Sequence, residues 1–364
     1  MLEGMRTAGQ LRRRADDGDL AIEGGLLDGH LVRVKRNVYV DAPASPGTWL
    51  ARASQHDALV EAVRRDGDDG VVALESAVML HGGRVWETTS SLHLVVGYHS
   101  EGLRAVHFSE HIRDLGPAAR RRALRSRPVI RHCWPVDDDD VVIIDGLRVT
   151  SLARTMEDCA RFLPADAAMV AVDSLLAIGS GACAPGERDG AGRPWDRAEE
   201  INTAANVLRA EVAQRLKDRP RQRGVRRARA VIAAGSPWSQ SAYETELRRL
   251  CLVNGVVPPM PQMPVRTPWA TYFIDLGWWG LRKGAEVDGD VKLEGDPEAE
   301  LERRAARDLD VHDMGIDLAH FTTEDVRDPA RVMEKLGVLL PPSAFTAVPA
   351  ESLRTPWERR SVEW

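Results

Sequence analysis

The sequence predicts a mixed α/β (α+β) protein built from several modules, and three stretches support this. An amphipathic pattern over Ser241–Val253 predicts a helix, and two short strands are expected after it, at 271–278 and 283–287. Residues 30–40 alternate between valines and basic side chains, as a β-hairpin does. Residues 141–160 combine a short apolar strand with a capped amphipathic helix.

The totals set the limits of this prediction. With 364 residues, 43% of them hydrophobic, the chain is long enough for two or three packed domains and is not of disordered composition. The net charge of -6 is unevenly spread: 111–132 and 211–231 are arginine-rich, whereas 285–313 is strongly acidic. Basic segments beside an acidic pocket suit a protein that holds a phosphate backbone next to a metal ion. The alternative is that the arginine-rich segments are solvated helix faces.

The cysteines and the hydropathy exclude some classes. The four cysteines lie far apart and form no C-x-x-C pair, so neither a zinc ribbon nor a disulfide framework is predicted. No apolar run approaches membrane-spanning length, and the N-terminus lacks a hydrophobic signal core. We therefore expect a cytoplasmic protein with reduced thiols.

The N-terminal segment is expected to contain a helix over 4–17 and a basic hairpin over 30–40, with its turn at 35–37. The residues between Asp19 and Gly29 show no clear helical pattern. The cationic side chains of the hairpin are Arg33, Lys35 and Arg36. A basic hairpin after small helices resembles the wing of a winged-helix DNA-binding domain, as in AbiEi-type antitoxins. That resemblance implies contact with DNA phosphates through these three residues. Protective charges on an edge hairpin are the alternative.

The middle of the chain also resembles AbiEi-type proteins. The similarity lies in Ser76–Gly82 and in the segment 146–160, where Arg154 and Asp158 are spaced to pair on a helix. His81 has no cysteine or serine partner evident in the sequence, so a packed or capping histidine is expected. Helices are predicted over 165–178 and 201–216, with a Gly- and Pro-rich loop between them. In the basic stretch that follows, Arg226, Arg227 and Arg229 are candidates for tracking nucleic-acid phosphates.

The C-terminal half carries the residues with chemical potential. Glu244 lies on the predicted helix, Asp275 on the first strand, and Glu286 and Asp288 on the second. Strand alternation places Glu286 and Asp288 on one face, and Asp275 can share it if the register allows. Carboxylates this close repel one another unless a cation lies between them. Mg²⁺ or Mn²⁺ suits such oxygen ligands and would support hydrolysis of a phosphodiester.

A helix Glu, a strand Asp and a following Glu-x-Asp-Gly resemble the PD-(D/E)xK nuclease superfamily, in particular the branch related to very-short-patch repair endonucleases. The resemblance covers roughly 236–340 and implies a restriction-endonuclease-like fold. It implies that Asp275 and Glu286 ligate the metal, that Glu244 binds through water or tunes the site, and that Asp288 orients water. Asp288 stands where much of the superfamily has lysine, and the histidine frequent after Asp-Gly is absent. The missing charge is expected from Lys292, Arg303 or Arg304.

Each acid also has a structural interpretation. Ser241-x-x-Glu244 has the spacing of a capping box, Asp275 could face solvent, and Glu286 and Asp288 could belong to an acidic surface. Their structural setting decides between these interpretations.

The expected modules are a winged-helix-like module (1–50), an AbiEi-like α/β module (51–178), a flexible insertion with a basic helical linker (179–235), a PD-(D/E)xK nuclease-like domain (236–340) and a mobile tail (341–364). The predicted function is a Mg²⁺-dependent DNA endonuclease of repair or defence type. The first alternative is a non-enzymatic regulator or antitoxin that binds DNA through its winged helix, and the second is an RNA-directed nuclease or toxin. DNA is the expected partner, with a cognate toxin or a second copy of the chain as further partners and no membrane.

Overall fold

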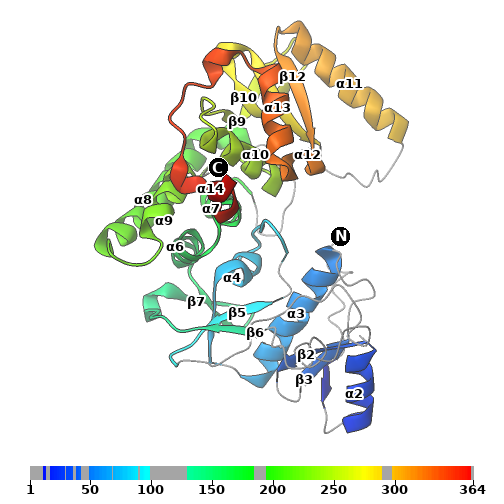
Figure 1. The fold of residues 1–364 in the computed structure, drawn as a ribbon, viewed down its shortest axis with the longest axis vertical. Helices are drawn as coiled ribbons and strands as arrows, with labels where there is room; N and C mark the ends of the chain where they lie inside the picture. The colour runs from blue at the N-terminus through cyan, green and yellow to red at the C-terminus, as the bar shows by residue number, and fades with distance from the viewer. Residues whose placement is uncertain are drawn as a thin grey trace. The chain divides into compact units, whose positions relative to one another are not determined.

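The computed structural model describes residues 11–13, 17–28, 30–35, 38–41, 49–67, 69–88, 91–98, 129–183, 194–288 and 297–361. The chain forms two compact units (Figure 1). Unit 1 comprises Met1–His81 with Glu87–Thr155, and unit 2 comprises Gly82–Trp86 with Met156–Trp364. The prediction of a mixed α+β protein is confirmed, since helices accompany three separate sheets in the described residues.

In the described residues, the N-terminal part of unit 1 is a small sheet with helix α2 packed on it. Its elements are β1 (Leu11–Arg13), α2 (Asp19–Leu27), β2 (Leu31–Lys35) and β3 (Val38–Asp41), and the strand order is β1-β3-β2. The predicted hairpin is confirmed by the antiparallel pairing of β2 with β3. The helix expected over 4–17 is wrong at 11–13, where the chain forms β1 and pairs with β3.

Helix α2 was not predicted, and its glycines explain why. Gly24 and Gly25 weaken helix propensity. A Cβ on Gly25 would lie 2.6 Å from Leu31 Cδ1, so glycine lets the helix approach β2 closely. Ile22 and Leu26 then bury their side chains with Leu31 and Tyr39. Tertiary packing therefore overrides local propensity here.

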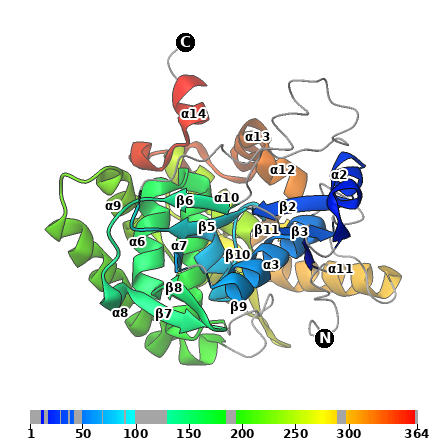
Figure 2. The ribbon, with the colours of Figure 1, turned by 90° about the horizontal axis from the view of Figure 1, so that it is seen from below.

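The larger part of unit 1 is a five-stranded mixed sheet in the order β6-β5-β4-β8-β7. Its elements are α3 (Trp49–Asp66), β4 (Val71–Val72), α4 (Leu74–Leu80), β5 (Leu92–Val95), β6 (Val129–His132), η2 (Asp138–Asp140), β7 (Val141–Ile144) and β8 (Leu147–Thr150). β5 and β6 run parallel and side by side (Figure 2). Leu59 and Val63 of α3 belong to the same buried cluster as Leu92, Leu94 and Val149 of the sheet.

The segment around Arg154 is structural, as expected. Arg154 is buried, pairs with Asp140 at 2.9 Å between Nη1 and Oδ2, and donates from Nη2 to the carbonyl of Pro135. Nε2 of the His81 ring lies 2.8 Å from the carbonyl oxygen of Thr150. Its packed position confirms that His81 serves the fold of unit 1.

Buried histidines should make unit 1 sensitive to acid. His56 is 1% exposed, and neither of its ring nitrogens has a hydrogen-bond partner among the described residues. Burial lowers the pKa of His56 to about 4. Burial and the neighbouring His132 lower the pKa of His93 to about 3. The unfolded chain therefore binds protons below about pH 6.5 that the folded unit does not, and stability falls as pH drops from there towards these values.

We accordingly expect the melting temperature of unit 1 to fall between pH 6.5 and 4, and to fall less steeply in a His56→Leu protein. Differential scanning calorimetry across this pH range measures both slopes. Equal slopes for the two proteins would show that His56 does not titrate on unfolding.

Unit 2 begins with a layer of helices: α6 (Leu152–Phe162), α7 (Ala165–Ser180), η3 (Pro194–Arg197), α8 (Ala198–Asp218) and α9 (Val225–Ala234). The boundary between the units falls within α6. The predicted helices at 165–178 and 201–216 lie within α7 and α8, and residues 184–193 lie outside the described residues. Buried Asp173 of α7 accepts hydrogen bonds from Ser239, Thr245 and Arg248. These bonds fix the helical layer to the start of the segment that carries the acidic residues.

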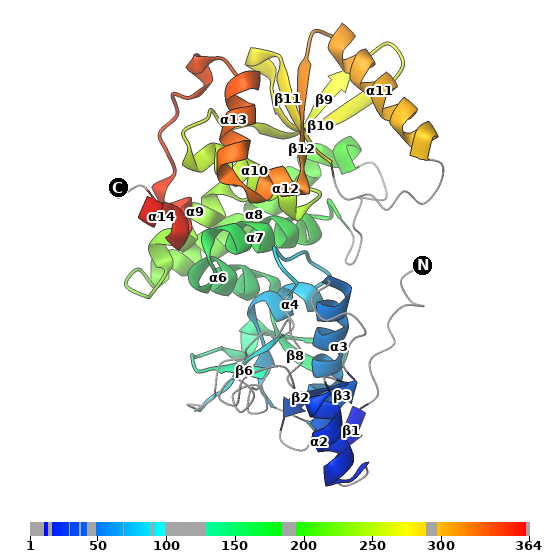
Figure 3. The ribbon, with the colours of Figure 1, turned by 45° about the vertical axis from the view of Figure 1, so that its right-hand side comes forward.

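That segment contains α10 (Ala242–Val253), β9 (Met260–Arg266), β10 (Thr271–Trp278), η4 (Trp279–Leu281), β11 (Lys283–Asp288), α11 (Pro297–Asp313), β12 (Asp317–Thr322), α12 (Thr323–Arg327) and α13 (Pro329–Leu339). The sheet order is β12-β11-β10-β9. β10 is antiparallel to both neighbours, and β12 is parallel to β11 after the crossover through α11. α11 and α13 lie on opposite sides of β12 (Figures 1 and 3).

The chain beyond Pro341, expected from its composition to be mobile, is folded against α10. It forms η5 (Pro342–Ala344), η6 (Glu351–Leu353) and α14 (Pro356–Ser361). Buried Arg249 of α10 donates to the carbonyl of Leu353 and pairs with Glu358 at 2.7 Å between Nη2 and Oε1. A buried guanidinium is costly unless it is paired and hydrogen-bonded. The bonds from Arg249 to Leu353 and Glu358 therefore hold the C-terminal segment against α10.

Candidate functional site

The first acid of the site is positioned by the start of α10. Ser241 caps the helix, its Oγ accepting from the backbone N–H of Glu244 at 3.1 Å. The Glu244 carboxylate accepts from the N–H of Gln240, one residue before the cap, so only half of a capping box forms. Glu244 is 6% exposed. Its Oε2 accepts a hydrogen bond from Nε2 of Gln262 on β9 at 3.4 Å. The capping role of Ser241 and the site role of Glu244 are therefore compatible.

Asp275 lies in β10 and is held from both neighbouring strands. Its Oδ1 accepts from Gln262 Nε2 at 3.2 Å, and its Oδ2 accepts from the backbone N–H of Val287 on β11 at 2.8 Å. Gln262 adopts a φ of 50°, a conformation rare for a residue other than glycine. The amide of Gln262 thereby links two carboxylates, Glu244 and Asp275. Such a strained residue is typical of a functional site.

Glu286 lies in β11 beside Asp275. The hairpin register pairs Leu276 with Ala285, so Asp275 and Glu286 are the next residues along the two strands. Glu286 is 6% exposed, and its Oε1 accepts from Arg307 Nη2 of α11 at 2.7 Å. The sequence did not single out Arg307.

Hydrogen bonds through Gln262 and the pairing of β10 with β11 bring these three carboxylates together, and the pKa of each is raised. Burial raises the pKa of Glu286, and the charge of Asp275 raises it further, against the opposing effect of Arg307. Burial and the charge of Asp275 likewise raise the pKa of Glu244 well above its ordinary value. Burial also raises the pKa of Asp275. The raised pKa values mean that these carboxyl groups ionise less readily than usual unless a nearby cation compensates their charge.

Asp288, the fourth acid, lies at the more exposed margin. Its Oδ2 is 3.3 Å from His320 Nδ1 on β12, and its Oδ1 is 3.5 Å from Arg304 Nη1 on α11. The other ring nitrogen of His320, Nε2, lies 3.1 Å from Asp308 Oδ2. The parallel pairing of β11 with β12 sets Glu286 opposite His320. The imidazole beside Asp288 is therefore that of His320, which is far along the chain but on the neighbouring strand. No histidine directly follows the Asp288-Gly289 dipeptide.

The other predicted charges are distributed differently. Of the three residues expected to replace the missing lysine, Arg304 reaches Asp288, whereas Lys292 lies outside the described residues. Arg307 was not among these three residues, yet it is Arg307 that pairs with Glu286. Its signal in the sequence was only its spacing on α11, three residues after Arg304.

The basic stretch around α9 has mostly structural contacts. Arg227 donates to the carbonyls of Ala160 and Arg161 at the end of α6. Arg229 donates to the carbonyl of Leu216 at 3.1 Å, and Arg226 is exposed. Arg227 and Arg229 therefore cap helix ends.

The basic hairpin is described only in part. Arg33 lies on β2 and is partly exposed. The side chain of Lys35 and the whole of Arg36 lie outside the described residues.

Carboxylate oxygens are ligands of the kind that hard divalent cations take. Among the described residues, no three His, Cys, Asp or Glu side chains come together in a way that could hold a metal ion. Magnesium differs from most metals in needing only one or two carboxylates, with water and phosphate oxygens completing its shell. Asp275 and Glu286 are the pair that could serve in this way.

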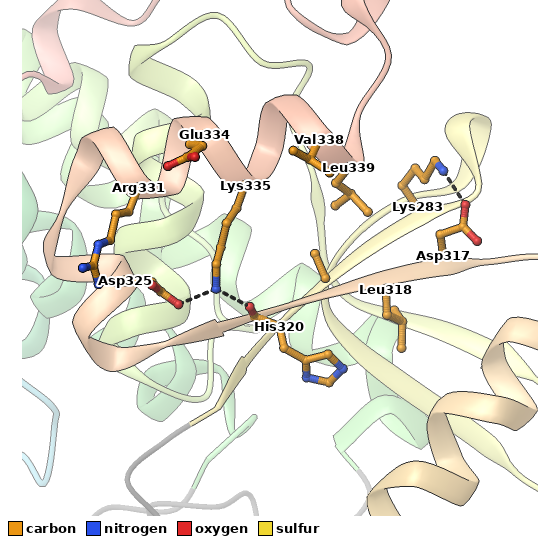
Figure 4. A pocket seen from close by; sticks show the side chains of 11 residues that line it. Lys283, Asp317, Leu318, His320, Asp325, Arg331, Glu334, Lys335, Val338 and Leu339 are labelled. Atoms are coloured by element: carbon orange, nitrogen blue, oxygen red, sulfur yellow. Dashed lines mark hydrogen bonds and ion pairs between the residues drawn. The ribbon is translucent and has the colours of Figure 1, made fainter.

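A cavity of about 570 Å³ is lined mainly by residues of β12 and α13. Lys335 of α13 crosses it to donate to the carbonyl of His320 and to Asp325 at 2.6 Å, while the ring of His320 points away from Lys335 (Figure 4). Arg331 and Glu334 also line it, and its charges are balanced. Because Asp275 and Glu286 do not line it, the cavity and the acidic cluster are separate features that share His320.

Comparison of the chain with protein-family models, with curated proteins and with solved structures finds no match. No helix in the described part of the chain is both long enough and apolar enough to cross a membrane.

Proposed function

We propose that unit 2 carries a PD-(D/E)xK-like nuclease site that hydrolyses DNA phosphodiester bonds with Mg²⁺ or Mn²⁺. The observation that carries this proposal is the convergence of Glu244, Asp275 and Glu286 from α10, β10 and β11, through the Gln262 amide and the pairing of β10 with β11. The order of elements supports it, because a helix precedes three antiparallel strands and a crossover helix leads to a parallel fourth strand.

In this proposal Asp275 and Glu286 hold the metal ion, which would polarise the phosphoryl group and activate a water molecule. Gln262 fixes the orientation of Asp275 through the 3.2 Å bond to its Oδ1. Glu244 lies behind Gln262 and contributes negative charge that strengthens the attraction for a cation. Asp288 lies beside His320 at the exposed margin, and its proposed role is to accept a hydrogen bond from the attacking water.

The experiment is plasmid nicking by the purified chain with Mg²⁺, with Mn²⁺ and with a chelator. We expect nicking in either metal and none in the chelator. Duplex DNA, single strands and RNA are compared in the same assay. Preferential cleavage of RNA would favour the RNA-directed alternative over the DNA endonuclease.

The non-enzymatic regulator remains the second candidate, and the N-terminal sheet supports it. Helix α2 packs onto the β2–β3 hairpin, and a helix packed beside a basic hairpin is one part of a winged-helix module. Arg33 lies on the hairpin and is partly exposed. In this proposal the hairpin contacts phosphates and the C-terminal sheet serves as a scaffold.

For Arg33→Ala we expect weaker binding to all duplex sequences, with the slope of log affinity against log salt reduced by about 1, as for the loss of one phosphate contact. Fluorescence anisotropy at several salt concentrations measures the slope. An unchanged slope would show that this residue does not contact the DNA backbone.

A further inference from the structure

Arg307 occupies an unusual position between the acidic cluster and solvent. A single nitrogen, Nη2, donates both to Glu286 Oε1 at 2.7 Å and to the carbonyl of Phe273 at 2.9 Å. Within the described part of the chain, Nε and Nη1 have no hydrogen-bond acceptor in the structure. The side chain is 30% exposed, whereas that of Glu286 is 8% exposed. The guanidinium also lies over the Tyr272 ring, with Cζ 5.9 Å from the ring centroid. As far as the described residues go, most of its hydrogen-bond donors are therefore unused at the edge of the site.

The ion pair and a metal ion make incompatible demands on Glu286. A cation that ligates Oε1 needs the oxygen lone pairs to which Arg307 donates. Two positive charges a few ångströms apart repel strongly in a partly buried site, so the guanidinium would have to turn away as the metal enters. The planar fork of an arginine matches the oxygens of a phosphate, and that is the group which a nucleic-acid substrate brings to this edge.

We propose that Arg307 is a phosphate-binding residue of the site, and that it competes with the divalent cation for Glu286 until a substrate phosphate accepts it. The inference rests on the proposed nuclease function for the identity of both ligands. It implies that metal and DNA assist each other's binding, because each removes an obstacle to the other. Such coupling is reciprocal by thermodynamic necessity.

The test is calorimetric titration of Mn²⁺ into wild type and Arg307→Gln, with and without a non-cleavable DNA duplex. Without DNA, we expect Arg307→Gln to bind Mn²⁺ about 5-fold or more tighter than wild type, since a competing charge is gone. The duplex should raise the Mn²⁺ affinity of wild type by a similar factor and have less effect in the variant. DNA cleavage by Arg307→Gln should nevertheless fall, because the phosphate loses its ligand.

Arg331→Gln is the matched control, as Arg331 lies on α13 with a side chain that is 58% exposed. It should change neither Mn²⁺ affinity nor its dependence on DNA. Circular dichroism and melting curves establish that each variant folds, and Arg307→Lys, which retains the charge, should restore part of the coupling. Equal or weaker Mn²⁺ binding by folded Arg307→Gln would overturn the inference, as would the absence of Mn²⁺ binding by both proteins. Coupled Mn²⁺ and DNA binding without any cleavage would contradict only the proposed nuclease function.

Discussion

Replacing Asp275 by asparagine is expected to lower metal-dependent DNA cleavage by more than about 100-fold. Removing only the hydrogen-bonding partner of a metal ligand costs about 10–100-fold in metal affinity or activity, and this substitution changes a proposed ligand itself. The substitution keeps the size of the side chain and one oxygen. It removes the charge proposed to attract the cation, and that charge adds to the effect of burial in raising the pKa values of Glu244 and Glu286. DNA binding should be retained, since the change removes no cation.

The measurements are initial nicking rates and gel-shift affinities on the same preparations. Asp317→Asn is the matched control, because Asp317 is an exposed aspartate of β12 that pairs with Lys283 outside the acidic cluster. It should cleave at the wild-type rate. Equal cleavage by wild type and Asp275→Asn would mean that a contaminating nuclease is responsible. If neither protein cuts and both shift DNA, the regulator becomes the better description.

The largest expected effect on stability comes from Arg249. Arg249→Met should lower the free energy of unfolding of unit 2 by about 3–5 kcal/mol, as is usual when one partner of a buried ion pair is removed. Burial raises the pKa of Glu246 to about 7 even with Arg249 beside it. Without the guanidinium, Glu246 is left buried with no cation, and the C-terminal segment loses its bonds from Arg249 to Leu353 and Glu358.

Urea denaturation followed by circular dichroism measures this change. Arg331→Met serves as the control, since its carboxylate neighbours Asp325 and Asp328 lie at 3.8 Å and its side chain is largely exposed. Exposed pairs of this kind contribute up to about 1 kcal/mol. A loss of similar size in both variants would show that the network around Arg249 does not stabilise unit 2.

The sequence located the acids better than it located their partners. Glu244, Asp275 and Glu286 could be assigned to a helix and two strands because periodicity reports local structure. Gln262, Arg307 and His320 were missed because each meets the cluster through a tertiary contact. Gln262 would have been the easiest of the three to find in the sequence, because it is a polar residue in the mostly apolar strand β9. In the structure its side chain is buried there.

Two errors have the same physical origin. Composition made the segment beyond Pro341 look mobile, because nothing local shows that Glu358 is the partner of a buried arginine more than a hundred residues earlier. Low propensity hid α2, whose glycine at position 25 is required by close packing against Leu31. In both places, contacts that are distant in sequence decide the local structure.

The central claim is that Asp275 and Glu286 share one divalent cation. Anomalous diffraction from a crystal soaked in Mn²⁺ tests it most directly. A peak bridging the Asp275 and Glu286 carboxylates, with the Arg307 guanidinium displaced from Glu286, is the predicted result. A native-like crystal with no peak there, or with the Arg307–Glu286 pair intact at saturating Mn²⁺, would contradict the claim.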